Sequence, residues 1–238
     1  MQRVLITGAG RGIGLEVARQ YAQRGDLVLA GCRAIEQAPG LRRLVEEQGD
    51  RVRVVDLEVT DAASIAAALS QAHRHVEGLD VLINNAAINP GDAQVAGPDG
   101  QQLLDPARIL DVLRVNAVAP LLVAQAFIAL LRLGVNPRVV NISSGAGSLT
   151  YKTDGGDYSY SASKAALNMI TRTFAFNVRG DGVTAVVIDP GWVKTDMGGP
   201  DAHLEPQQSA QGLLTVVDRL TIDDAGRYLN YDGAQLPW

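Results

Sequence analysis

Tyr160 and Lys164 lie four residues apart in the segment Y-S-A-S-K. In a helix, this spacing places both side chains on the same face. A free phenol titrates near ~10, so at neutral pH it is a weak proton donor unless a nearby cation stabilises its phenolate. The lysine ammonium is a candidate for that cation, and the pair therefore predicts acid–base chemistry at Tyr160. Ordinary contacts on a solvated helix surface have the same spacing, so the pair alone leaves both interpretations open.

A glycine-rich turn lies near the N-terminus. The apolar run at 4–6 precedes T-G-A-G-R-G-I-G at 7–14, and apolar positions at helical spacing follow. A strand, a glycine turn and a helix in this order place backbone N–H groups and a helix N-terminus against a phosphate. The glycines at 8, 12 and 14 fit T-G-x-x-x-G-x-G rather than G-x-G-x-x-G. The pattern predicts a dinucleotide turn, and a glycine turn without a nucleotide is the alternative.

Together the two motifs resemble those of the short-chain dehydrogenase/reductase family, and further matches follow in the family's order. The sequence N-N-A-A at 84–87 follows an apolar strand, and Asn116 lies in V-N-A on the next helix. Ser143 and Ser144 close another strand, and P-G-W-V-K-T at 190–195 follows the next. The resemblance covers nearly the whole chain. The segments 161–169, 190–199 and 231–238 are similar to the C-factor and sniffer carbonyl-reductase branch.

The resemblance implies reversible hydride transfer between a nicotinamide and a carbonyl or alcohol carbon. Tyr160 would then be the general acid or base, and Lys164 would also bond the nicotinamide ribose. Ser144 would hold the substrate oxygen and Asn116 would support a proton relay, whereas Ser143 is more simply a hydrogen-bonding residue at the strand end. The implied cofactor-binding residues are Gly8, Arg11, Gly12, Ile13, Gly14, Arg33, Asp56, Leu57, Asn84, Tyr160, Lys164, Val193 and Thr195.

Two arginines bear on the type of cofactor. An enzyme that prefers NAD(H) commonly has a carboxylate at the end of the second strand, where it binds the ribose hydroxyls. Here that position is followed by Arg33, which can pair with a 2′-phosphate, and Arg11 offers a second cation within the glycine turn. We therefore expect NADP(H) rather than NAD(H). Asp56 and Leu57 match positions that hold the adenine ring, although Asp56 could simply form a turn.

Apolar strands alternate with helical patterns along the chain, which predicts a parallel sheet covered by helices on both faces. We expect one α/β domain over 1–238, a Rossmann-like doubly wound fold with a mainly parallel seven-stranded sheet. Long helical patterns occupy 64–75, 108–133 and 159–179, the second with an irregularity at Pro120. The expected strands are 3–6, 27–31, 51–56, 81–84, 138–142, 184–189 and 227–230.

Three irregular stretches follow predicted strands, at 89–105, 145–157 and 198–207. Ligands of open α/β sheets bind beyond the carboxyl ends of the strands. We therefore expect these loops to choose the substrate, a small-molecule carbonyl or alcohol. The Gly-Gly-Pro sequence at 198–200 could hinge a lid, and a surface loop without function is the alternative.

Composition restricts the class of protein. The 238 residues are 47% hydrophobic and 20% charged, with a net charge of -5, which fits a globular domain and argues against nucleic acid as a partner. Cys32 is the single cysteine, so no intrachain disulfide is expected. We see neither a signal peptide nor an apolar run of ~18 residues, so we expect a cytoplasmic protein without a membrane partner. His73 and His75 lack further ligands, and no metal site is expected.

Two further expectations concern assembly and function. The helices that hold Asn116 and Tyr160 form the usual dimer face of the family, which implies a homodimer or homotetramer. An NADP(H)-binding regulatory or signalling module with incidental turnover is the alternative function. The presence of Asn116, Ser144, Tyr160 and Lys164 favours the enzyme, because a sensor has no chemical need for the phenol and the ammonium together.

Overall fold

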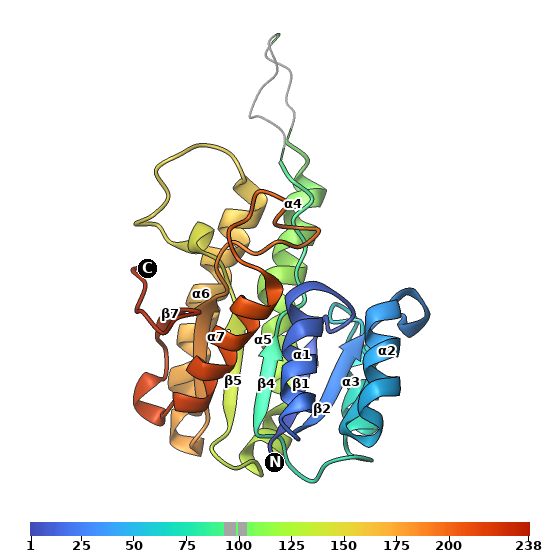
Figure 1. Cartoon of the computed structure of the whole chain (residues 1–238). Helices are drawn as coiled ribbons and strands as arrows, with labels where there is room; N and C mark the ends of the chain where they lie inside the picture. The colour runs from blue at the N-terminus through green and yellow to red at the C-terminus, as the bar shows by residue number, and fades with distance from the viewer. Residues whose placement is uncertain (93–98, 100–103) are drawn as a thin grey trace.

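A seven-stranded sheet with the order β3-β2-β1-β4-β5-β6-β7 forms the centre of the computed structural model, which describes residues 1–92, 99 and 104–238 (Figure 1). Every neighbouring pair of strands is parallel, so the expected fold class is confirmed. The strands are β1 (Arg3–Thr7), β2 (Leu27–Cys32), β3 (Val52–Asp56), β4 (Val81–Asn84), β5 (Arg138–Ile142), β6 (Thr184–Asp189) and β7 (Tyr228–Asn230).

Helices cover both faces of this sheet and bury two separate apolar cores. On one face lie α1 (Gly12–Gln23), α2 (Pro39–Gln48) and α7 (Pro206–Arg219). On the other lie α3 (Ala62–Ala72), α5 (Ala119–Arg132) and α6 (Tyr158–Val178). Alternate residues of a strand serve the two cores: Val4 and Ile6 face the first helix layer and Leu5 the second. This explains why the central strands are continuous apolar runs.

The long helical pattern expected at 108–133 is divided in the structure. A short helix, α4 (Pro106–Leu113), continues through a π-helical turn at Arg114–Val118 into α5. Pro120 lies in the first turn of α5 and has no N–H to donate, so a regular ladder of hydrogen bonds cannot run through this point. The expected irregularity is confirmed, and Asn116 lies within it.

The same stretch, Pro106–Arg132, is long and apolar enough to cross a membrane by length and composition, contrary to the expectation that no such run exists. Its packing is that of a core helix. Val123, Phe127 and Leu131 on α5 are fully buried in the second core, against strands of the sheet. Burial inside the protein therefore accounts for the apolar side chains on one face of α5.

Several element boundaries differ from expectation. β3 begins at Val52 because Arg51 belongs to a 3₁₀ turn, and the last strand begins at Tyr228. The loop expected at 198–207 ends early, because Pro206 begins α7 after a capping box between Glu205 and Gln208. Helices α2 and α7 were not among the long helical patterns. Most of the expected substrate loop at 89–105 lies outside the described residues.

Candidate active site

Tyr160 and Lys164 lie on α6 beside the carboxyl end of β5. Tyr160 is in the first turn of the helix, and the ammonium nitrogen of Lys164 lies 5.6 Å from the centroid of the Tyr160 ring. Only 2% of Lys164 is exposed, and its Nζ donates to the carbonyl of Ile142, the last residue of β5, at 2.8 Å. The structure thus brings the predicted pair together and anchors the cation at the central strand.

The pKa values of this pair differ from the simplest expectation. Burial raises the pKa of Tyr160 to about 12, although a hydrogen bond with Ser144 opposes the change. Burial also lowers the pKa of Lys164 to about 8, against the attraction of Asp189. With a pKa of about 8, Lys164 is neutral in the pH range where the phenol titrates, so it does not lower the pKa of Tyr160 in the free protein. In the free protein the phenol therefore keeps its proton at neutral pH, and the expected lowering of its pKa by Lys164 is not seen.

Replacing Lys164 with methionine should change how stability depends on pH. The folded pKa of Lys164 is lowered from 10.5 to about 8, so between these values the unfolded chain binds more protons and stability rises with pH. Lys164→Met removes this contribution. Above about pH 10 the raised pKa of Tyr160 acts in the opposite direction, so the useful window is about pH 8 to 10.

Urea unfolding of both proteins across that window measures the effect. We expect the free energy of unfolding of the wild type to rise relative to that of the variant, by at most about 1.4 kcal/mol per pH unit. If the free energies of unfolding of the two proteins change in parallel with pH throughout the window, burial does not destabilise the charged form of Lys164.

The two adjacent serines have different partners. Ser143 is 2% exposed, and its hydroxyl donates to Oδ1 of Asn168 at 2.7 Å, so it serves packing. The Oγ of Ser144 accepts from the backbone N–H of Ala146 at 3.2 Å, and Ser144 lies near enough to the phenol of Tyr160 to lower its pKa. The structure therefore brings Ser144, and not Ser143, to the phenol.

Asn116 fastens three segments to one another. Its Oδ1 accepts from the N–H of Ile88 at 2.9 Å, and its Nδ2 lies 2.8 Å from the carbonyl of Ile88 and 3.0 Å from Oγ of Ser163. The residue is 1% exposed. These bonds tie the segment after β4 and the π-helical turn to α6. Its expected part in a proton relay stays a prediction, because the recorded bonds of its side chain go to Ile88 and Ser163.

The glycine turn after β1 has the shape that a phosphate cradle needs. Gly8 and Gly12 have φ values of +67° and +56°, in the left-handed region, and a Cβ on Gly14 would lie 2.5 Å from the carbonyl oxygen of Gly8. Helix α1 begins at Gly12 without a side-chain cap and without an acidic residue in its first turn. Its first N–H groups can therefore bind an anion.

Asn85 stabilises this turn through hydrogen bonds, a role that was not predicted from the sequence. Its Nδ2 donates to the carbonyls of Thr7 at 3.0 Å and Gly8 at 3.2 Å, whereas its backbone N–H donates to Oγ1 of Thr7. The side chain of its neighbour Asn84, expected at the cofactor, is instead 3% exposed and donates to Oδ1 of Asn141 at 2.8 Å. Because successive strand residues face opposite sides, Asn84 points into the interior between the sheet and α5.

Some of the other expected cofactor residues are exposed near the carboxyl ends of the strands, and others are buried. Arg33 and Arg11 are largely exposed and form ion pairs with Glu58 at 3.2 Å and Asp196 at 2.8 Å. Exposed pairs of this kind are weak, so either cation can exchange its partner for a phosphate. Asp56 is exposed beside Arg33 at the ends of β2 and β3. Leu57 and Val193 are buried, each with 3% of its surface exposed, whereas Thr195 lies against Gly12.

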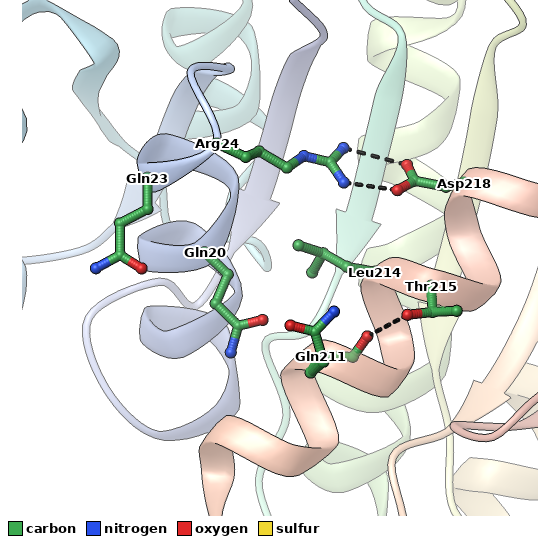
Figure 2. A pocket seen from close by; sticks show the side chains of 7 residues that line it. All are labelled: Gln20, Gln23, Arg24, Gln211, Leu214, Thr215 and Asp218. Atoms are coloured by element: carbon green, nitrogen blue, oxygen red, sulfur yellow. Dashed lines mark hydrogen bonds and ion pairs between the residues drawn. The ribbon is translucent and has the colours of Figure 1, made fainter.

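A groove of about 390 Å³ lies elsewhere, between α1 and α7, and is lined by none of the expected site residues (Figure 2). Arg24 and Asp218 form an ion pair of 2.6 Å across it, and three glutamines, Leu214 and Thr215 line the remainder. Among the described residues, no group of three or more histidine, cysteine, aspartate or glutamate side chains could hold a metal ion.

Comparison with known proteins decides the family. Residues 2–205 match the family profile described as short chain dehydrogenase. The chain belongs to the short-chain dehydrogenase family. It is 42% identical to C-signal of Myxococcus xanthus over 165 residues, which are 67% of this chain and 93% of that protein.

Solved structures agree with this assignment. The NADPH-bound carbonyl reductase from chicken fatty liver matches with a TM-score of 0.89 and 36% identity, over 100% of this chain and 99% of that chain. Carbonyl reductase Sniffer of D. melanogaster matches with a TM-score of 0.91 and 30% identity, over 100% of both chains. The resemblance seen in the sequence, including the C-factor and sniffer branch, is confirmed.

Within this dehydrogenase, α6 receives its N-terminal cap from a distant segment. Asp157 precedes the helix with φ +52° and makes no side-chain cap. Asp92 caps it instead: one carboxylate oxygen accepts from the hydroxyl of Ser159 at 2.7 Å and the other from its N–H. Ser159 is fully buried next to Tyr160. No local sequence signal connects Asp92 with a helix 67 residues away.

Replacing Asp92 with alanine should therefore lower both stability and turnover. Loss of the cap costs about 1 kcal/mol of unfolding free energy, and displacement of Tyr160 should lower kcat roughly tenfold. Asp61→Ala is the matched control, since Asp61 caps α3 through the N–H of Ala63 at 2.9 Å. Urea unfolding and kcat of both variants check this. If the two lose equal stability and neither loses turnover, Asp92 has no part in placing the phenol.

Proposed function

We propose that this short-chain dehydrogenase is an NADP(H)-dependent carbonyl reductase, with Tyr160 as the proton donor. One observation carries the proposal: a half-buried, protonated phenol lies close to the hydroxyl of Ser144 at the same edge of the sheet as the glycine turn. When bound, the nicotinamide supplies or accepts the hydride at the substrate carbon. The proton of the phenol passes to the carbonyl oxygen as negative charge develops there.

Each site residue then has a defined task. Ser144 holds the substrate oxygen by hydrogen bonding, next to the phenol. Lys164 keeps a positive charge below the phenolate that forms when the proton leaves, and in the reverse direction the phenolate accepts a proton from the alcohol. The glycine turn and the N-terminus of α1 would hold the diphosphate, and Arg33 and Arg11 the 2′-phosphate. Together with Asn116, these residues make the regulatory alternative the weaker hypothesis.

The rim of the site favours apolar carbonyl compounds. Large apolar side chains are exposed in the segments that follow β4, β5 and β6, at the end of the sheet where the substrate is expected (Figure 1). Burying them against a substrate is favourable, whereas leaving such a group in water is not. We infer an aromatic or hydrophobic ketone, aldehyde or quinone. The rim residues are Ile88, Leu149, Tyr151, Trp192 and Met197.

Assembly and location are part of the same proposal. We infer a cytoplasmic homodimer or homotetramer in which residues 1–238 form one domain. Exposed apolar side chains on α4, on α6 and around the start of α5 support an interface between copies. These side chains are Leu110, Val118, Leu122 and Met169.

A carbonyl panel tests the proposal, with Arg33→Ala as the variant for the cofactor. We expect oxidation of NADPH by at least one quinone, aldehyde or ketone. Loss of one charge-assisted contact, about 1.5 to 3 kcal/mol, should reduce the preference of Arg33→Ala for NADPH over NADH by roughly ten- to a hundredfold. Arg53→Ala is the control, an arginine that pairs with Asp50 at 2.7 Å. An enzyme that is inert with every carbonyl while NADPH still binds tightly would refute the reductase.

A further inference from the structure

The last residues of the chain fold back along β7, the edge strand of the sheet. The N–H of Asn230 donates to the carbonyl of Ala234, and the N–H of Leu236 donates to the carbonyl of Tyr228, both at 2.8 Å. This tail, residues 234–238, covers the open side of β7. Covering the edge of a sheet prevents the edge strand from pairing with other chains. This protection is enough to explain why the first residues of the tail pair with β7.

Trp238 is held by more contacts than edge protection requires. Its ring lies 5.3 Å from the ring of Tyr228, and the guanidinium of Arg172 on α6 lies 5.2 Å from its centroid. Its main-chain oxygen accepts from Thr150 twice, from the N–H at 3.1 Å and from the hydroxyl at 2.9 Å. The residue thus joins β7, α6 and the loop that follows β5.

This loop is the one that begins with Ser144. The hydroxyl of Ser148 lies 2.8 Å from the carbonyl oxygen of Pro237. The backbone N–H of Ser148 donates to the carbonyl of Gly145 at 3.0 Å. On the opposite side, Nδ2 of Asn168 donates to the carbonyl of Gly147 at 3.2 Å. The segment 144–150 is therefore clamped between α6 and the tail.

A second connection reaches Ser144 directly. The phenol of Tyr228, the residue whose ring packs on Trp238, donates to the carbonyl of Ser144 at 2.6 Å. Burial raises the pKa of Tyr228, so this phenol stays a donor at neutral pH. A displaced Trp238 would therefore free the ring of Tyr228 and the loop at Thr150 at the same time.

We propose that Trp238 is a positioning residue for Ser144, acting through Tyr228 and through the loop 144–150. The proposal rests on the reductase function above. It assigns to the tail a part in binding and orienting the carbonyl, in addition to covering β7. No backbone hydrogen bond joins the glycine turn to the tail in the part of the chain that the structure describes, so we expect cofactor binding to be independent of Trp238.

Four variants test this role against a purely structural one. Trp238→Ala removes the ring, and Trp238→Phe keeps an aromatic ring on Tyr228. Thr150→Val removes one hydroxyl bond to the tail, and Thr215→Val is its matched control. The hydroxyl of Thr215 donates to the carbonyl of Gln211 at 2.8 Å, a bond that stays within α7 (Figure 2).

The readouts are kcat and KM for an active carbonyl, the Kd for NADPH and the melting temperature. We expect kcat/KM to fall roughly tenfold in Trp238→Ala and less in Thr150→Val, with NADPH affinity within about twofold of the wild type. Trp238→Phe should restore most of the loss, and Thr215→Val should show none.

Other outcomes overturn the proposal. Values of kcat/KM in Trp238→Ala and Thr150→Val that match those of Thr215→Val would show that the tail only covers the sheet edge. A parallel loss of NADPH affinity and carbonyl turnover would show a general loss of structure. An inactive wild type would refute the reductase function, and with it this role of Trp238, whereas an active wild type with unaffected variants would refute the role alone.

Discussion

Tyr160→Phe should lower carbonyl reduction by roughly a hundredfold to ten-thousandfold, the range that a positioned proton donor contributes. The substitution removes one oxygen and keeps the ring that packs at the start of α6. Because the phenol is protonated in the free protein, its loss removes the proton donor without leaving a buried charge unpaired. NADPH affinity should change little, because the glycine turn and Arg33 are unaffected. Initial rates and fluorescence titration with NADPH measure the two quantities.

Tyr21→Phe is the matched control for this experiment. The hydroxyl of Tyr21 is buried without a hydrogen-bond partner among the described residues, so the same chemical change occurs in the core of the protein, far from the loops of the site. We expect Tyr21→Phe to keep full activity. If Tyr160→Phe retains more than about a tenth of the wild-type rate, the phenol is not the principal proton donor.

Gly14→Ala should abolish cofactor binding and destabilise the protein. A Cβ at this position would lie 2.4 Å from Nδ2 of Asn85 and 2.5 Å from the carbonyl oxygen of Gly8. Either the helix or the turn must move, and overpacking of this kind costs about 1 to 3 kcal/mol. The displaced turn would no longer present its N–H groups to a diphosphate. Thermal unfolding and NADPH titration measure the two losses.

Gly180→Ala provides the comparison, because a Cβ there meets nothing within 4 Å and the residue does not have a positive φ. It should leave both NADPH affinity and melting temperature close to those of the wild type. Wild-type NADPH affinity in Gly14→Ala would show that the close approach of Gly14 to Gly8 is not needed for the cofactor.

Local patterns predicted the parts of the fold that depend on local chemistry. Three features could be predicted from short stretches of sequence: the buried runs of the strands, the glycine turn, and the spacing of Tyr160 and Lys164. Hydrophobic periodicity and the steric limits of a tight turn both act over a few residues. The family resemblance singled out Ser144 as the residue that holds the substrate oxygen, and Pro120 indicated an irregularity in the helix. Helices α2 and α7 were not predicted, and the start of α7 depends on a capping box that was not recognised in the sequence.

Long-range contacts explain what could not be predicted. Asp92 caps a helix 67 residues away, and Trp238 reaches Thr150 across 88 residues, so no local pattern announces either contact. Asn84 and Asn85 look equivalent in the sequence, but the alternation of a strand sends one inward and the other to the glycine turn. The pKa of Tyr160 depends on its burial, which spacing alone does not reveal.

Transfer of deuterium from NADPH labelled at the nicotinamide C4 position to a carbonyl substrate tests the central claim most directly. Hydride transfer with protonation by Tyr160 predicts an alcohol that carries deuterium on the former carbonyl carbon and a solvent-derived proton on its oxygen. The wild type and Tyr21→Phe should form this product, and Tyr160→Phe should form it at least about a hundredfold more slowly. NADPH that binds tightly but transfers no deuterium to any carbonyl of the panel would contradict the account.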